Sequence, residues 1–243
     1  MFISFLKQGM QFGMEGIFQV IMENNAGIKS IPRTHSKELI VFSSIASFAF
    51  HPLLMTALMA FAVYKLAPDD FSNFPFSEFK KWFSQLLLYT VLLPLIFIFI
   101  FRISGLISNA TMHRSRDRIL PLLATIFFYF LAYSFFICHY NFPLLFQILL
   151  LGSCSAIIVV FVINFFYKIS IHTTAAAILP GFCITLLLNE SLVMILPLLL
   201  ALLVAIIVGI VRWLLGAHTM GQILLGYTVG ILTQLAAYLY LNT

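Results

Sequence analysis

Two stretches decide the fold: residues 86–100 read LLLYTVLLPLIFIFI, and residues 192–211 read LVMILPLLLALLVAIIVGIV. Neither stretch contains a charged side chain. Uncharged apolar runs of this kind cannot be kept in water and are typical of helices that span a membrane.

The whole chain has the same character. Of its 243 residues, 62% are hydrophobic and 9% are charged, whereas about a quarter of the residues in a soluble domain are charged. The net charge of +5 comes from cations between the apolar segments, which favours membrane flanks and anionic headgroups over a nucleic-acid surface. We therefore expect an integral membrane protein that binds membrane lipids and no nucleic acid, while the sequence leaves any protein partners unknown.

Seven segments are long and apolar enough to cross a membrane as helices, which takes about 20 residues each. The predicted fold is all-α, a polytopic transmembrane helical bundle of about seven spans in one domain (residues 38–243). Residues 1–37 are more polar and are predicted to form an interfacial amphipathic helix. Pro52, Pro94, Pro180 and Pro197 predict kinks, and the three cysteines are expected to be small core residues. The spans are expected at residues 39–64, 83–107, 119–137, 143–166, 173–188, 192–211 and 219–240.

With seven spans, three polar connections emerge at the membrane face that also holds the N-terminal segment: residues 109–118, 166–172 and 212–218. They contain cations, hydroxyls and imidazoles, and almost no carboxylate. Arg offers a planar fork of donors to phosphate oxygens, Lys a point charge and Ser a further donor, so the set suits a phosphate. It does not suit a hard metal ion, which needs oxygen ligands, so no metal or other cofactor is expected.

Two of the imidazoles in these connections, His172 and His218, supply what phosphoryl transfer requires. A neutral ring can attack phosphorus, and a protonated ring can donate to the departing oxygen. His218 and Gln222 are four residues apart, so on a helix they share a face, and Gln222 can accept a hydrogen bond from the ring nitrogen that does not attack. Arg212 would not share that face, but Gly216 lets the chain turn so that both point at one pocket.

Three short motifs resemble those of the type 2 phosphatidic acid phosphatase superfamily, which includes the vanadium haloperoxidases. Residues 212–222 (R-x5-H-x3-Q) resemble the family's S-R-x5-H-x3-D, and residues 169–172 (I-S-I-H) resemble P-S-G-H. Residues 118–121 (R-I-L-P) resemble K-x6-R-P more loosely, with two inserted residues and Thr111 at the position of the lysine. The resemblance covers roughly residues 100–240.

The resemblance implies a metal-independent phosphatase that works through a phosphohistidine. In the roles it implies, the nucleophile is His218, the general acid is His172, and the phosphate ligands are Arg212, Arg118 and Ser170; Lys168 lies in the same connection as Ser170. Gln222 stands where the family has an aspartate that stabilises the imidazolium. Ile171 stands where the family has a glycine that lets a backbone N–H approach the phosphate.

Simpler explanations exist for several of these residues. Arginine at a helix end holds membrane topology, which is how Arg114 and Arg116 are interpreted, and His218 alone could be a satisfied histidine of the bundle. His51 and His139 could be imagined as a haem pair, but each is interpreted as a packed or interfacial residue.

The sequence thus favours an integral membrane phosphatase that hydrolyses a lipid phosphate or a prenyl (di)phosphate, in the bacterial cytoplasmic membrane. The alternative is a non-catalytic lipid-phosphate binder or transporter, which the glutamine and the isoleucine of the motifs favour. Ten of the 13 lysines and arginines lie on the side of the motifs, which predicts a cytoplasmic site. The resembled family more often has its site on the outer face, so the side stays open.

Overall fold

A computed structural model describes residues 37–66, 71, 74–107, 115–139, 142–188 and 195–242, and these residues form helices and connections without strands. Six helical segments among them are long and apolar enough to cross a membrane, and a bent helix pair gives a seventh, so the predicted all-α membrane bundle is confirmed. The interfacial helix predicted for residues 1–37 lies, apart from Lys37, outside the described residues. The elements are α2 (Lys37–Ala49), α3 (Pro52–Leu66), α4 (Phe76–Leu87), a π-helical turn (Leu88–Leu92), α5 (Leu93–Ile103), a 3-10 turn (Ser115–Arg118), α6 (Ile119–His139), α7 (Leu144–Phe166), α8 (Ile171–Leu188), α9 (Ile195–Leu214) and α10 (Met220–Leu241).

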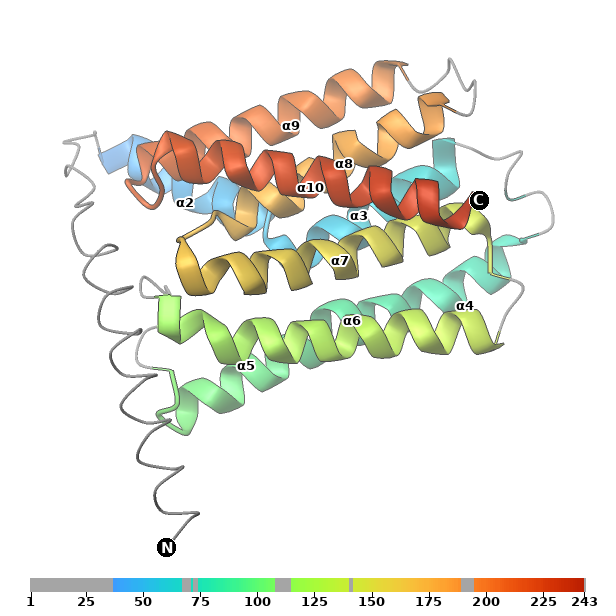
Figure 1. Ribbon diagram of the computed structural model, residues 1–243, viewed down its shortest axis with the longest axis horizontal. Coiled ribbons are helices and arrows are strands. Elements are labelled where there is room, and N and C mark those ends of the chain that lie inside the picture. The colour runs from blue at the N-terminus through green and yellow to red at the C-terminus, as the bar shows by residue number, and fades with distance from the viewer. Residues whose placement is uncertain are drawn as a thin grey trace, which may run out of the picture.

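The central helix of the bundle is α8, whose side chains are buried almost throughout residues 173–186. It packs against α10, α9 and α3, and most closely against α10 (Figure 1). The face of α10 toward α8 carries Gly226 and Gly230, where an added Cβ would lie 2.9 Å from the Ser170 carbonyl oxygen and 2.7 Å from the Ala177 Cβ, respectively. Small residues at this spacing let membrane helices approach backbone to backbone. The close approach fixes the start of α8 beside the start of α10.

The predicted span 39–64 is a bent pair, α2 and α3, with an angle of 56° between its halves. The bend lies at Pro52, because proline has no N–H to donate and its ring collides with the carbonyl group four residues before it. The kink predicted at this proline is confirmed. Pro94, Pro180 and Pro197 lie inside continuous helical spans, and the kinks predicted at these three prolines stay predictions.

The predicted span 83–107 was placed too late, because the helix begins at Phe76 and reaches Ile103. Charges in its first turns made this stretch resemble a loop. The apolar residues, however, recur at helical spacing: Phe79, Trp82 and Leu86 are buried, while the lysines between them face outward. The spacing of the apolar residues was therefore a better guide than the local charge.

The polar connections of the chain gather as predicted. The end of α5, the start of α6, and the α7–α8 and α9–α10 connections lie at one end of the bundle, on the left in Figure 1. The last turns of α6, α8 and α10 and the first turns of α7 and α9 lie at the opposite end. Cys154 and Cys183 are buried, as expected of core residues, whereas the side chain of Cys138 is outside the described part.

A candidate anion site inside the bundle

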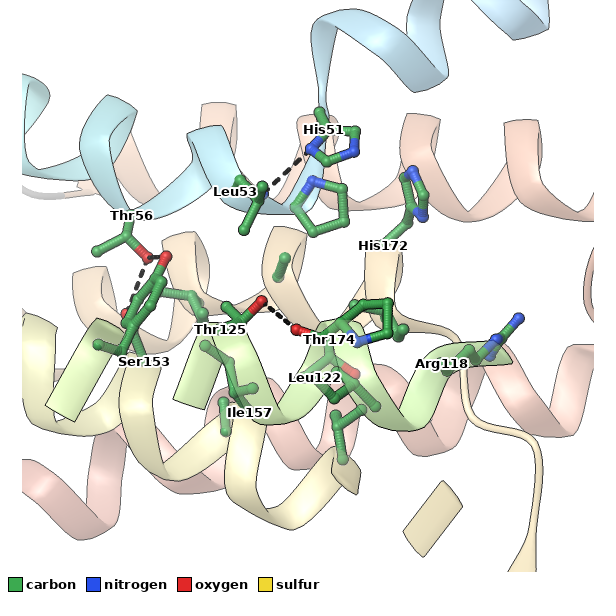
Figure 2. Close-up of a pocket in the computed structure, with 18 of the residues that line it drawn as sticks. His51, Leu53, Thr56, Arg118, Leu122, Thr125, Ser153, Ile157, His172 and Thr174 are labelled. Carbon is green, nitrogen blue, oxygen red and sulfur yellow. Dashed lines mark hydrogen bonds between the residues drawn. The ribbon is translucent and has the colours of Figure 1, made fainter. Parts of the chain in front are cut away.

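A cavity of about 200 Å³ lies between α3, α6, α7 and α8 and reaches the last turn of α9. Figure 2 shows His51, His172 and Arg118 near one end of it. Four of the seven predicted site residues line the cavity wall, and no aspartate or glutamate does so in the described part of the chain. These four are Arg118, His172, Arg212 and His218.

The other three predicted residues lie outside the described cavity wall and hold together the segments that form it. Arg118, which lines the cavity, also holds these segments together, because its Nη1 donates to the Ile169 carbonyl oxygen at 3.0 Å. The backbone N–H of Ser170 donates to the Gln222 carbonyl oxygen at 3.3 Å, and Lys168 Nζ donates to the Ala217 carbonyl oxygen at 3.2 Å. Three bonds thus fix the α7–α8 connection to α6 and to the α9–α10 connection. The roles of Lys168 and Ser170 as phosphate ligands stay predictions.

Ser170 also has a local task, because it precedes the first residue of α8. Its Oγ accepts a hydrogen bond from the Thr173 N–H at 3.4 Å, the arrangement of an N-cap. The cap starts the helix one residue before His172, so the imidazole leaves the first turn of α8 into the cavity. The hydroxyl can still donate its own hydrogen while it accepts this bond.

Gly216 turns the chain at the end of α9, as its position in the sequence predicted. Its φ of 62° lies in the left-handed region that only glycine adopts freely. The Ala217 N–H donates to the Arg212 carbonyl oxygen at 3.2 Å, and the Gly216 N–H donates to that of Trp213 at 3.0 Å, which together form a Schellman motif. The reversal brings His218 back to the same cavity as Arg212.

The predicted contact between His218 and Gln222 is present, although the geometric reason given for it was wrong. His218 precedes α10, whose N-cap is Thr219, so the two side chains are not on one helical face. Gln222 instead reaches back in a capping box, where its Oε1 accepts from the Thr219 N–H at 3.3 Å and lies 2.9 Å from His218 Nδ1.

This capping box fixes the proton on the His218 ring. The amide atom facing the Thr219 N–H must be an oxygen, because only an oxygen can accept that bond. The same oxygen faces His218 Nδ1, so Nδ1 carries the hydrogen in the neutral ring and Nε2 keeps its lone pair. The ring therefore presents Nε2 as a nucleophile.

Positive charge is disfavoured throughout this end of the cavity. Burial, followed by the charge of Arg118, lowers the pKa of His218 to about 3 against the opposing effect of the Gln222 hydrogen bond, so the ring is neutral at pH 7. Burial and then Arg212 lower the pKa of Arg118 to about 10. Burial, followed by the two arginines, lowers the pKa of Lys168 as well. A bound anion would relieve this repulsion.

Arg212 has donor capacity to spare. Its Nη1 donates to Ser47 Oγ at a long 3.4 Å, and its buried Nε has no hydrogen-bond partner among the described residues. A buried guanidinium donor without an acceptor is costly unless a ligand supplies one. Arg212 is therefore placed to receive an anion from the cavity.

His51 is a site residue that the sequence interpretation missed. It lies at the break before α3 and lines the cavity opposite His172, with 5.9 Å between the ring centroids in an edge-to-face arrangement. Its Nδ1 accepts from the Leu53 N–H at 3.4 Å, so the ring caps α3 and its Nε2 carries the hydrogen when neutral. An imidazole in the middle of an apolar span is itself a signal of function and could have identified it. The side chain of His139, considered with His51 as a haem pair, is not described.

Comparisons of the chain with protein-family models, with curated proteins and with solved structures found no match. Together, fold and site define a polytopic helical membrane protein with a cavity inside its bundle, and the end of that cavity beside Arg118 and Arg212 is cationic.

Proposed function

We propose that this protein is an integral membrane phosphatase that hydrolyses a lipid phosphate or prenyl (di)phosphate through a phosphohistidine, as the resemblance to the type 2 phosphatidic acid phosphatases implies. The observation that carries the proposal is the tautomer of His218, which the Gln222 capping box fixes with Nε2 free, in a cavity lined by two arginines and two further histidines. The cytoplasmic membrane of a bacterium is the proposed location.

Binding of the phosphate follows from the charges in the cavity. Arg118 and Arg212 line it from the start of α6 and the end of α9, and a guanidinium offers phosphate oxygens paired donors. The capped start of α8 adds the positive end of a helix dipole at the same place. A lipid would place its phosphate here while its hydrophobic part stays among apolar side chains.

The first chemical step forms a bond between His218 Nε2 and phosphorus and breaks the bond between phosphorus and the lipid oxygen. The bound phosphate offsets the positive charge of the cavity, so that His172 is protonated in the complex and gives its proton to that oxygen. The lipid then leaves as an alcohol, or as a monophosphate if the substrate is a diphosphate. The carbonyl oxygen of the Gln222 amide faces the Nδ1–H of the imidazolium that forms. Both arginines stabilise the charge on the transferring oxygens.

The second step returns the enzyme to its first state. Neutral His172 takes a proton from water while the water oxygen attacks phosphorus, and the bond from phosphorus to Nε2 breaks. Inorganic phosphate is released, and His172 is again protonated. Neither step uses a metal, because the described wall of the cavity carries cations and no carboxylate, and such a wall repels a divalent cation.

The test is phosphate release by the purified protein in nanodiscs, with a panel of lipid monophosphates and prenyl phosphates. We expect release that a chelator leaves unchanged and that vanadate inhibits, since vanadate can take the five-coordinate geometry of the attacked phosphorus. Release that a chelator abolishes and magnesium restores would contradict the mechanism. Saturable binding of a lipid phosphate without release would instead support the non-catalytic binder that Gln222 and Ile171 favour.

Gln222→Glu is expected to accelerate the chemical step. Glutamate keeps the length of the side chain and both contacts of Oε1, and its charge stabilises the imidazolium better than an amide does. A gain of about 1.4 kcal/mol corresponds to about tenfold in single-turnover rate. Gln222→Leu should lower the rate, because Nδ1–H then has no acceptor.

Thr219→Ala is the matched control for Gln222. It removes the other half of the capping box, in which the Gln222 N–H donates to Thr219 Oγ1 at 3.4 Å, and leaves the contact to His218 in place. The single-turnover rate of this variant should stay within about threefold of the parent. The lost cap stabilises α10 by about 1 kcal/mol but does not contact the His218 ring. Equal rates for the parent, Gln222→Glu and Gln222→Leu would show that residue 222 does not act on His218.

His51→Asn is expected to keep the fold and to reduce turnover by about ten- to a hundredfold. Asparagine is a good N-cap and can accept the Leu53 N–H in place of Nδ1, whereas the imidazole Nε2–H that faces the cavity is lost. A hydrogen bond to a charged group contributes roughly 1.5–3 kcal/mol, which sets the expected loss. Phosphate release and thermal unfolding of His51→Asn and His51→Ala are compared; full activity in the asparagine variant would remove His51 from the site.

A further inference from the structure

The cavity has a second polar end, which the proposed chemistry does not use. Figure 2 shows Thr56 and Ser153 at the end away from Arg118 and His172, with Leu122 and Ile157 between the two ends. Thr56 Oγ1 and Ser153 Oγ are 3.1 Å apart, and the Tyr129 hydroxyl is 3.1 Å from Thr56 Oγ1. All three side chains line the cavity, and each is at most 2% exposed.

These hydroxyls differ from the other threonine hydroxyls in the cavity wall. Hydroxyls in membrane helices usually donate to a carbonyl of their own helix, as Thr125 does to Pro121 and Thr174 to Ser170 in the same cavity wall. Thr56 and Ser153 make no such bond in the described part of the chain. They come from α3 and α7, Tyr129 comes from α6, and the three hydroxyls bond one another.

The hydrogen-bond chain can offer a ligand either a donor or an acceptor. If Tyr129 donates to Thr56 and Thr56 to Ser153, the Ser153 hydrogen is left for the cavity. If the chain runs the other way, Tyr129 turns to Thr90, which lies within reach of its hydroxyl, and Ser153 Oγ keeps its lone pairs for the cavity. Hydroxyl groups rotate between these states, so the inner end suits any small oxygen-bearing group.

The cavity between the ends is elongated and narrow. The lining residues of α6 are Pro121, Leu122, Thr125 and Tyr129, which share one face of the helix, and Arg118 lines the cavity from the turn directly before it. Tyr129 lies 11 residues after Arg118, which corresponds to roughly 16 Å of helix. A volume of about 200 Å³ along that path admits one slender segment of a ligand, since a cavity of about 150 Å³ already holds benzene, and does not admit two chains.

We infer that the ligand is a single-chain phosphate ester whose hydrophobic chain enters the bundle between α3, α6 and α7 and carries an oxygen-bearing group that hydrogen-bonds Ser153 and Thr56. The inference rests on the proposed function for the position of the phosphate. It narrows the substrate class, because a prenyl chain is pure hydrocarbon and would leave the inner hydroxyls without a ligand partner. A chain with a hydroxyl or carbonyl group supplies that partner.

The experiment uses dodecyl phosphate and a series of analogues with one hydroxyl moved along the chain, together with their non-hydrolysable phosphonates. Phosphate release gives kcat/KM, and calorimetry with the phosphonates gives affinity without turnover. We expect one hydroxyl position to be preferred over the plain chain by about tenfold in both measurements, the size of one net hydrogen bond. The other positions should be worse than the plain chain, because they bury a hydroxyl without a partner.

Ser153→Ala and Thr56→Val should abolish the preference for that position over the plain chain. Thr125→Val is the matched control, since its hydroxyl lines the same cavity but is already bonded to its own helix, and the preference should persist. If plain chains are hydrolysed and no hydroxyl position is preferred, or if Ser153→Ala keeps the preference, this inference is overturned and the proposed function stands. If neither plain nor hydroxylated chains bind or react, the proposed function fails with it.

Discussion

His218→Ala is expected to reduce phosphate release by at least about a thousandfold, because it removes the atom that attacks phosphorus; losses on this scale are typical of a missing nucleophile. Binding of the non-hydrolysable lipid phosphonate should change little, because Arg118 and Arg212 remain. The pair of results separates catalysis from binding. The measurements are single-turnover release and calorimetric affinity on the same preparation.

The outcome for His218→Ala also decides between the two functional hypotheses. A phosphatase loses turnover and keeps affinity. A binder that never formed a phosphohistidine shows no turnover in the parent, so the substitution changes nothing. Residual release above a tenth of the parent rate would mean that another group attacks phosphorus, and the assignment of the nucleophile would be wrong.

Arg212→Lys should lower kcat/KM by about a hundredfold, and Arg212→Ala by about a thousandfold or more. Lysine keeps the charge but loses the fork of donors, including the buried Nε that has no partner among the described residues. Two hydrogen bonds to a charged phosphate contribute roughly 3 kcal/mol together, which corresponds to about a hundredfold. The further decrease in kcat/KM of Arg212→Ala comes from the loss of the positive charge, which Arg212→Lys retains.

Arg102→Lys is the matched control for this series. Arg102 lies in the last turn of α5, at the same end of the bundle, is exposed, and is not among the cavity residues. It should retain the parent activity, so that a general effect of arginine at this membrane face can be separated from the effect of Arg212. Equal losses for the two lysine variants would contradict a specific contact between Arg212 and the phosphate.

Much of the fold could be predicted from the sequence because a membrane span has a simple physical requirement. The runs at residues 86–100 and 192–211 could be satisfied only by helices in lipid. The start of α4 at Phe76 was missed because Glu78 and two lysines lower the average hydropathy, although Phe79 and Trp82 are spaced as one helical face. The average hydropathy of a segment predicts which residues lie in the membrane, whereas the spacing of its apolar residues predicts where the helix begins.

The site was predicted in part. The sequence predicted that four residues would meet, because an even number of spans separates their connections and because Gly216 turns the chain. The structure brings these four to one cavity: Arg118, His172, Arg212 and His218. The contact from His218 to Gln222 was predicted for a continuous helix and is made by a capping box, since the N-cap at Thr219 lies between them.

The remaining site residues could not be obtained from connections alone. His51 reaches the cavity only because the chain breaks at Pro52 and turns by 56°. Thr56, Tyr129 and Ser153 lie inside three different spans, each at an unremarkable position in the sequence, and only the packing of α3, α6 and α7 brings them together. Contacts between distant helices are fixed by packing, which local patterns do not encode.

The central claim is that a phosphoryl group is transferred to His218, and the direct measurement is to trap it. The purified protein is mixed with a lipid phosphate labelled in its phosphorus, quenched in base within one turnover, and digested for mass spectrometry. The account predicts a base-stable, acid-labile phosphoryl group on the peptide that contains residue 218 and no such group in His218→Ala. The group should be more abundant in His172→Ala when the loss of His172 slows hydrolysis of the intermediate more than its formation. Phosphate release without any labelled protein, or a label on a residue other than His218, would contradict it.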